Sequence, residues 1–163
     1  MISVGTLFSR QSAPLVGIDI SSSSVKLVEL AHDKAGNLVL ERCAIEPLER
    51  GWITDGNIEK FDEVAEALRR LIKKSGTRTK NVALALPPSA VITKKISLPA
   101  GMTDQELEVQ VESEANQYIP FSLDEVSLDF CVIGPNKGSP GDVDVLIAAS
   151  RREKVQDRQG LAE

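Results

Sequence analysis

Apolar positions in the first part of the chain follow strand-like spacing, then helical spacing, then strand-like spacing again. Three nearly continuous runs rich in Val, Leu and Ile predict a meander of three strands, at residues 15–20, 25–31 and 38–45. Apolar side chains then recur at helical spacing from Phe61 to Ile72, with acidic residues near the start, lysines near the end and Gly76 beyond. A further apolar run at 82–86 predicts a fourth strand. This order of elements is typical of an α/β unit with mixed strand pairing.

The pattern changes after the double proline Pro87-Pro88, which predicts a boundary because neither ring can donate a hydrogen bond to a sheet. Alternation at 91–98 predicts a half-exposed strand. Thr103 and Glu106 predict a capping box, and the helix that it opens is predicted to continue as far as the next proline. Two further alternating segments predict a hairpin around a loop rich in Gly and Pro, at 126–132 and 143–147.

These patterns divide the chain of 163 residues into three predicted parts. They are an N-terminal lead at 1–14, a first unit at 15–87 and a second unit at 88–163, which ends within a polar segment of helical character. The lead is predicted to be a disordered tail, since it is too short and too weakly basic to bind a membrane stably by itself.

Charge is spread unevenly along the chain. The net charge of −5 argues against binding to the phosphates of nucleic acid. The segment from Ile96 to Asn136 contains no Lys, Arg or His, so the rest of the chain is net positive. Its eight carboxylates are Asp104, Glu106, Glu108, Glu112, Glu114, Asp124, Glu125 and Asp129. Two interpretations stay open: a solvated helix face, or a surface that is complementary to a basic segment of a partner.

Few side chains offer catalysis or metal binding, and no catalytic residue is predicted. His32 is the single histidine, and Cys43 and Cys131 lack the spacing of a metal site and are predicted to be reduced, buried thiols. No apolar run approaches the roughly 18 residues that cross a bilayer. The first residues also lack the features of a secretory signal. We therefore expect a cytosolic protein.

One turn combines a carboxylate, hydroxyl groups and a lysine, in the sequence GIDISSSSVK at 17–26. A strand that ends at Asp19 and turns through serines offers amide and hydroxyl donors to phosphate oxygens, with the carboxylate placed for a hydrated magnesium ion. Serine-rich turns are common, so the residues by themselves leave an ordinary hairpin turn as the alternative.

In context, the stretch VGIDISSSSVKLVEL at 16–30 resembles the first phosphate motif of the actin-like ATPase superfamily. The stretches at 82–130 and 144–150 are similar to the PilM family, FtsA-like proteins of type IV pilus assembly, most specifically in "SAVITK" and in "EANQYIPF" followed by "LDEVSLDF". The resemblance implies an actin-like α/β fold. Residues 15–87 would be the first part of the ribonuclease-H-like subdomain 1A, and 88–163 the inserted FtsA-type subdomain 1C, truncated at its last helix.

The resemblance also implies an ATP and magnesium site. Asp19 would stand near the magnesium ion through water, Ser21, Ser22 and Ser23 would form the turn over the β- and γ-phosphates, and Lys26 would contact a phosphate. The superfamily commonly has Gly where this chain has Ser21, which favours binding over fast hydrolysis. Family members are about twice as long and close the site with motifs absent here, so ATP is expected only in the full-length protein.

Finally, the resemblance implies a role in pilus biogenesis and twitching motility, as a cytoplasmic protein peripheral to the inner membrane. The expected partner is the cytoplasmic N-terminal peptide of PilN, alongside other pilus platform proteins and self-association. The expected contact residues are Ile96, Leu107, Glu108, Val111, Glu112 and Glu114. The alternatives are a turning-over ATPase or sugar-kinase-like enzyme of the same superfamily, and an FtsA-like filament protein.

Overall fold

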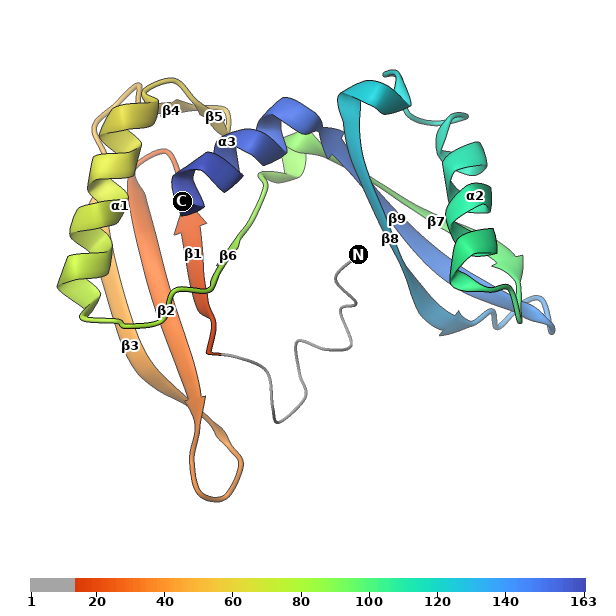
Figure 1. Ribbon diagram of the computed structural model, residues 1–163, viewed down its shortest axis with the longest axis horizontal. Helices are drawn as coiled ribbons and strands as arrows, with labels where there is room; N and C mark the ends of the chain where they lie inside the picture. Colours follow the sequence, from red (N-terminus) through yellow and green to blue (C-terminus); the bar gives the residue numbers. More distant parts are fainter. Residues whose placement is uncertain (1–13) are drawn as a thin grey trace. The chain divides into compact units, whose positions relative to one another are not determined.

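The structure is a computed structural model, and it describes residues 14–163. Nearly all of the predicted lead at 1–14 therefore lies outside the described residues. The described chain forms two compact units, one of residues 14–89 with 156–163 and one of residues 90–155. We call them the first unit and the second unit and describe each by itself (Figure 1). Within the described residues, no helix combines the length and the apolar character needed to span a membrane.

The first unit is built on a four-stranded sheet in the order β3-β2-β1-β6. Its elements are β1 (Val16–Ile20), β2 (Ser24–His32), β3 (Leu38–Pro47), the small hairpin strands β4 (Ile53–Thr54) and β5 (Asn57–Ile58), α1 (Phe61–Ser75) and β6 (Val82–Leu84). β1, β2 and β3 pair antiparallel, and β6 pairs parallel with β1. The predicted meander and the mixed pairing are confirmed, and the fourth strand is shorter than predicted.

The core of the first unit lies between helix α1 and the sheet. Gly76, with φ of 66°, ends the helix in the left-handed conformation, and its amide donates to the Ile72 carbonyl as predicted from the sequence. The helix packs against β2 and β3, and the apolar side of the sheet meets its apolar stripe. The fully buried side chains of this core are Val25, Leu27, Val64, Ala67 and Leu71.

The last eight residues of the chain belong to the first unit, whereas the sequence pattern predicted that they belong to the second. They form the end of α3 (Arg152–Ala162). Arg158 is only 5% exposed and donates to the Gly56 carbonyl at 2.8 Å, while Leu161 packs against the core. Burial lowers the pKa of the Arg158 guanidinium. A long-range contact of this kind leaves no periodic signal in a short polar helix.

The second unit is a three-stranded antiparallel sheet with one helix. Its elements are the 3-10 turn η2 (Pro88–Ala90), β7 (Val91–Pro99), α2 (Asp104–Ala115), the 3-10 turn η3 (Leu123–Glu125), β8 (Val126–Pro135) and β9 (Asp142–Arg151). The strands lie in the order β7-β9-β8. The predicted hairpin of β8 and β9 is therefore confirmed, and β7 pairs with the other edge of β9.

Both ends of α2 are explained by local chemistry. The capping box predicted at Thr103 and Glu106 is present, with the Glu106 carboxylate accepting from the Thr103 amide at 2.7 Å. That hydrogen bond is the main reason why the pKa of Glu106 lies below its ordinary value. The helix ends at Ala115, earlier than the predicted end at Pro120, because residues 116–118 tighten into a turn.

Candidate functional site

Three of the predicted nucleotide-binding residues meet at the turn between β1 and β2. Asp19 and Lys26 lie directly opposite each other in the antiparallel register. Lys26 Nζ donates to Asp19 Oδ2 at 2.8 Å and to Ser21 Oγ at 3.3 Å. The Ser21 hydroxyl and amide both donate to the Ser24 carbonyl, at 2.8 and 3.0 Å, which holds the turn closed. The turn therefore presents a carboxylate, an ammonium group and a hydroxyl as one cluster.

Ser22 and Ser23 form the exposed tip of this turn. Within the described chain, neither of their amides donates a hydrogen bond to another residue, while the Ser23 carbonyl accepts from the Leu48 amide at 2.9 Å. The Ser23 carbonyl thus anchors the tip, and the amides of Ser22 and Ser23 remain free to donate. Free amides and hydroxyls in a tight turn are the donors that phosphate oxygens require. With a single carboxylate in the cluster, a magnesium ion would be held largely through water and through the phosphates.

The predicted partner-binding residues divide into two groups on α2. Glu108 and Glu112 are exposed, and none of the eight carboxylates of the acidic segment forms an ion pair with another described residue. Leu107 and Val111 are instead buried in the second unit's core, 6% and 1% exposed, so their prediction as partner contacts is corrected. Amphipathic spacing identifies an apolar stripe but does not say whether a sheet or a partner covers it.

Two other residues predicted to contact the partner already have contacts within the second unit. Ile96 is half-buried and packs against the same core as Leu107. The Glu114 carboxylate accepts from the Tyr118 hydroxyl at 2.6 Å, and this hydrogen bond is the main reason why the pKa of Tyr118 is raised. Of the predicted contact residues, Glu108 and Glu112 are therefore the most available to a ligand. Sequence reasoning missed Val109, which is 68% exposed and lies between them.

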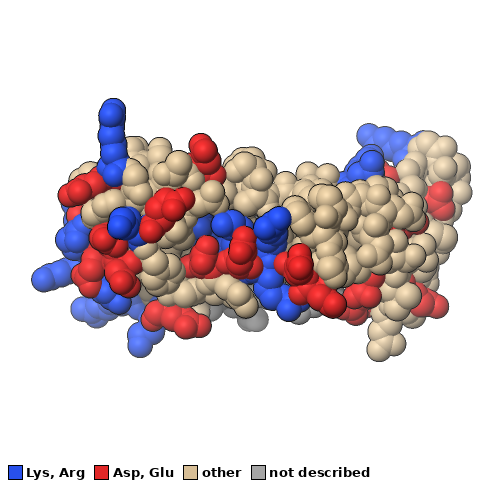
Figure 2. Space-filling model, turned by 90° about the horizontal axis from the view of Figure 1, so that it is seen from above, with Lys and Arg blue, Asp and Glu red and all other residues tan. Residues whose placement is uncertain are grey.

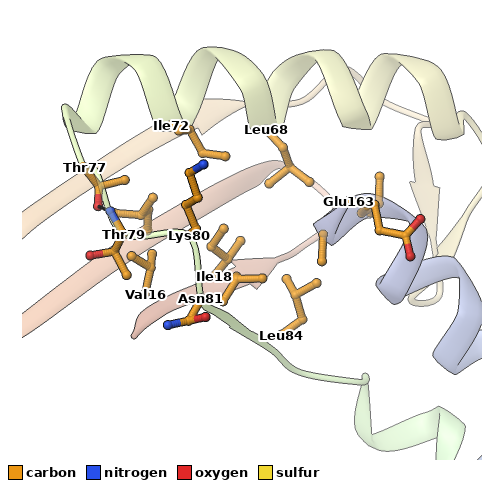
Figure 3. A pocket seen from close by; sticks show the side chains of 14 residues that line it. Val16, Ile18, Leu68, Ile72, Thr77, Thr79, Lys80, Asn81, Leu84 and Glu163 are labelled. Atoms are coloured by element: carbon orange, nitrogen blue, oxygen red, sulfur yellow. Dashed lines mark hydrogen bonds between the residues drawn. The ribbon is translucent and has the colours of Figure 1, made fainter. Parts of the chain in front are cut away.

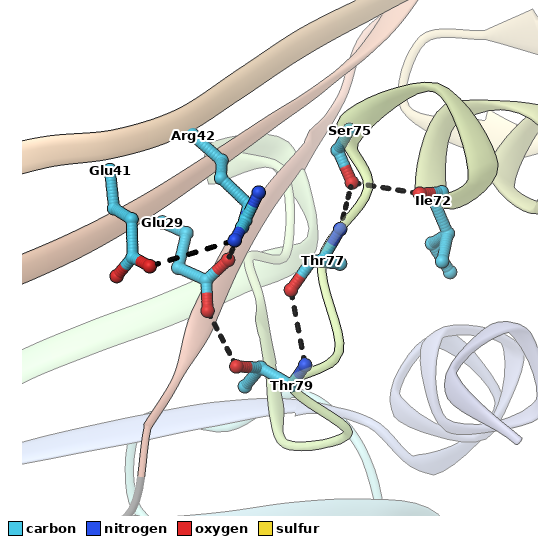
Figure 4. Close-up of polar contacts among 7 residues, drawn as sticks. All are labelled: Glu29, Glu41, Arg42, Ile72, Ser75, Thr77 and Thr79. Carbon is cyan, nitrogen blue, oxygen red and sulfur yellow. Dashed lines mark hydrogen bonds and ion pairs between the residues drawn. The ribbon is translucent and has the colours of Figure 1, made fainter.

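A buried polar cluster in the first unit was also missed. Glu29 on β2 is 6% exposed, accepts from the Thr79 hydroxyl at 2.5 Å and lies 3.2 Å from Arg42 Nε (Figure 4). Hydrogen bonds from Thr79 and Thr77 and the Arg42 charge hold the pKa of Glu29 below its ordinary value, against the opposing effect of burial. In the sequence Glu29 looks like an ordinary polar position of a strand, and only its contacts with distant residues show that it is a buried carboxylate.

Glu29 fixes the loop that follows α1. The Thr79 amide donates to the Thr77 hydroxyl at 3.1 Å, and the Thr77 amide donates to the Ser75 hydroxyl at 3.2 Å. The Ser75 hydroxyl in turn donates to the Ile72 carbonyl (Figure 4). This chain of contacts joins the end of α1 to the sheet through a loop with little apolar content. The loop's shape is thus set by polar contacts, and it forms one wall of the cavity described next.

A groove of about 390 Å³ opens beside α1 in the first unit. Its floor and walls are mainly apolar, from Val16, Ile18, Leu27, Leu68, Ile72, Val82, Leu84, Leu161 and Ala162. Thr77, Thr79, Lys80 and Asn81 line one end, and Glu163 lies at the other (Figure 3). The groove exists because α1 covers the part of the sheet formed by β2 and β3 and leaves β1 and β6 less covered.

Cys43 lies on the exposed side of β3, and Cys131 is half-buried. Both thiols are free, and the prediction that both are buried was wrong. Within the described residues, no group of three or more potential ligands could hold a metal ion.

Comparison with known proteins identifies the class to which this arrangement belongs. Among solved structures, the chain is similar to the one described as "PilM-PilN type IV pilus biogenesis complex", with a TM-score of 0.78 and 32% identity, over 94% of this chain and 44% of that chain. The chain thus has the mixed α/β fold of a type IV pilus biogenesis protein and spans less than half of the length of the chain it matches. Residues 17–163 match the family of type IV pilus assembly protein PilM, and the chain belongs to that family.

A second similar structure, described as diol dehydratase-reactivating factor in nucleotide free form, is 21% identical over 54% of this chain and 14% of that chain, with a TM-score of 0.32. That likeness is too low to support an argument.

Proposed function

We propose that this chain is the part of a PilM-type protein that binds the cytoplasmic N-terminal peptide of a PilN-type membrane protein during type IV pilus assembly. The observation that carries the proposal is the match to a chain of a PilM-PilN complex over 94% of the residues. The protein would act in the cytoplasm, at the periphery of the inner membrane, as part of the pilus assembly platform.

The chemistry of the second unit supports a peptide with basic residues. Glu108 and Glu112 are exposed and unpaired within the described chain, and no cation lies between Ile96 and Asn136 to neutralise them. Electrostatic complementarity of this kind raises association rates and selects partners more than it adds affinity. Ile96 and Glu114 are the other residues of the proposed contact, and both are half-buried within the second unit.

The test is a titration of a labelled PilN N-terminal peptide with the full-length protein, at low and at high salt. Binding that weakens as salt rises supports the proposal, because exposed charges are screened. A peptide with the same composition in scrambled order is the control. Absence of binding at both salt concentrations would refute the proposal.

We further propose that the full-length protein has an actin-like fold and binds Mg-ATP, with the turn at Asp19 to Lys26 as one wall of the site. Ser22 and Ser23 would donate to phosphate oxygens, Lys26 would offset phosphate charge, and Asp19 would hold water on the ion. When bound, magnesium would supply positive charge to the phosphates. The free amides of the turn tip support this fit.

Asp19→Asn tests this site in the full-length protein, with Asp62→Asn on the exposed start of α1 as a matched control. The expected result is weaker ATP binding for the first variant only, when binding is followed with a fluorescent ATP analogue. Equal affinities in the two variants would remove Asp19 from the site. Measuring phosphate release in the same samples separates binding from hydrolysis and tests the enzyme alternative.

A further inference from the structure

Charge alone does not single out a place for phosphates on the first unit. Figure 2 shows Lys and Arg side chains interspersed with Asp and Glu over the part of the first unit that it draws. Opposite charges interspersed in this way leave little net field, and salt screens what remains beyond about 8 Å. A phosphate site at the turn between β1 and β2 therefore depends on how a few donors are held at short range.

Lys26 is the cation of this turn, and its ion pair with Asp19 does not fix its position by itself. The side chains of Lys26 and Asp19 are 44% and 61% exposed. An exposed ion pair of this kind contributes little, because water competes for both charges and a lysine side chain loses rotamer freedom when it is held. A second contact is needed to keep the ammonium group at the turn.

The Ser21 hydroxyl supplies that second contact. Lys26 Nζ donates to Ser21 Oγ at 3.3 Å, in addition to Asp19 Oδ2 at 2.8 Å. The Ser21 hydroxyl itself donates to the Ser24 carbonyl at 2.8 Å. Because a hydroxyl has one proton and two acceptor positions, Ser21 can then only accept from the ammonium group. The same commitment of its proton leaves Ser21 without a side-chain donor for a phosphate.

The remaining contact of Ser21 completes the capacity of its hydroxyl. Ser24 Oγ lies 3.4 Å from Ser21 Oγ, and Ser24 is only 8% exposed. Since the Ser21 proton is directed at the Ser24 carbonyl, the Ser24 hydroxyl is the donor of this pair. Ser21 thus uses its one donor and both acceptor positions. Glycine at this position would keep the amide hydrogen bond that closes the turn, at 3.0 Å, and would lose every contact of the hydroxyl.

We propose that Ser21 is a positioning residue, whose hydroxyl holds Lys26 Nζ at the turn where the tip amides of Ser22 and Ser23 donate to no other described residue. The inference rests on the proposed Mg-ATP site, since phosphates are the groups that Lys26 and the tip amides would bind together. Ser21 would raise affinity through Lys26 and not by a side-chain contact with the nucleotide. A cation that is already in place loses less side-chain freedom when the phosphates bind.

A measurement without nucleotide tests the positioning itself. Reductive methylation of the full-length protein, followed by mass spectrometry, gives the reaction rate of each lysine amine. We expect Ser21→Ala to raise the rate at Lys26 by roughly threefold, because the amine is then held by one contact fewer. Lys34, which is exposed and forms no ion pair with another described residue, is the internal control and should react at an unchanged rate.

Ser21→Thr keeps the hydroxyl and should restore the wild-type rate at Lys26. Equal rates at Lys26 in the wild type and in Ser21→Ala would overturn the inference. A rate that rises as much in Ser21→Thr as in Ser21→Ala would also overturn it, since the hydroxyl would then not be the holding group.

A double-mutant cycle on affinity for a fluorescent ATP analogue, with magnesium and the full-length protein, tests the use of the lysine. Ser21→Ala should weaken binding by roughly threefold to tenfold in the wild-type background. In the Lys26→Met background the same substitution should cost nothing further, because its effect passes through the ammonium group. A purely structural role of Ser21 in closing the turn would cost the same in both backgrounds, and that result would overturn the inference.

The two measurements separate failure of this inference from failure of the proposed site. A wild-type protein that does not bind the ATP analogue would refute the Mg-ATP proposal, while the methylation rates would still decide whether Ser21 holds Lys26. Binding that Asp19→Asn weakens and Ser21→Ala leaves unchanged would overturn the inference and leave the Mg-ATP proposal intact.

Discussion

The two units of this protein place their charged side chains in opposite ways. Among the described residues, the two buried charged side chains, Glu29 and Arg158, both lie in the first unit, where each joins segments far apart in the sequence. The second unit keeps its carboxylates on the surface, and those of α2 have no cationic partner within the described chain. Charge in the first unit thus holds the fold together, while charge on α2 is available for binding.

The spacing of the carboxylates on α2 strengthens this contrast. Asp104, Glu108 and Glu112 follow one another at intervals of four residues, so they are neighbours along one helix face. Like charges at this spacing destabilise a helix, and acidic residues near a helix C-terminus oppose the helix dipole. A face that costs stability and has no cationic partner among the described residues supports the proposed role of these carboxylates in binding a partner.

Core truncation should give the largest difference between the units. Leu71→Ala in the first unit and Leu107→Ala in the second remove the same atoms, at sites 0% and 6% exposed. Both should lose about 2 to 5 kcal/mol of unfolding free energy, with Leu71 towards the upper end because it is completely enclosed. Chemical denaturation combined with amide exchange of α1 and α2 would assign each loss to its unit. A larger loss for Leu107→Ala would contradict the expectation that truncating the more completely buried side chain costs more.

The buried carboxylate should make the first unit sensitive to acid. The pKa of Glu29 is lowered by folding, so its contribution to stability is present above the ordinary glutamate value of 4.5 and is lost as pH falls through the lower folded value. Glu29→Gln should therefore be less stable than the wild type at neutral pH and approach it in acid. Thermal unfolding from pH 7 to pH 3 measures this difference.

Glu49→Gln, at an exposed position of the first unit, is the matched control for that experiment and should track the wild type throughout. If Glu29→Gln differed from the wild type by the same amount at every pH, the ionised carboxylate would not be the source of the stability.

Removing the cap of α2 should have a smaller effect, confined to the second unit. Thr103→Ala deletes the hydroxyl that accepts from the Glu106 amide at 3.3 Å, and caps of this kind contribute about 1 kcal/mol. The remaining hydrogen bond from the Thr103 backbone should still hold the pKa of Glu106 below its ordinary value. NMR titration of the Glu106 carboxyl, with amide exchange along α2, tests both parts. Faster exchange in α1 as well would contradict the expectation that the effect stays within the second unit.

Local chemistry explains what could be predicted from the sequence. The end of α1 at Gly76 and the capping box at Thr103 and Glu106 depend on residues within one or two turns of each other, and both are confirmed. The meander and the β8-β9 hairpin follow from alternation interrupted by turn residues. The resemblance to the PilM family, read from short stretches of sequence, is confirmed by a family match over residues 17–163.

Several of the missed features depend on contacts between distant segments. The burial of Leu107 and Val111 was unpredictable because the same stripe could have faced a partner. Glu29 reaches Thr79 across fifty positions, and Arg158 reaches Gly56 across more than a hundred, so neither contact leaves a local pattern. The groove results from how much of the sheet α1 covers, which helix periodicity does not specify. The ATP-binding role of the turn at Asp19 stays a prediction.

The most direct test of the proposed role of α2 measures peptide affinity and thermal stability together in one variant. Glu108→Gln with Glu112→Gln in the full-length protein keeps the size of both side chains and removes their charge. We expect affinity for the PilN N-terminal peptide to fall by roughly tenfold and to lose most of its salt dependence. The melting temperature should stay equal to that of the wild type or rise slightly, because like charges are removed. Unchanged peptide affinity together with a lower melting temperature would contradict the account, since these carboxylates would then serve the fold and not the partner.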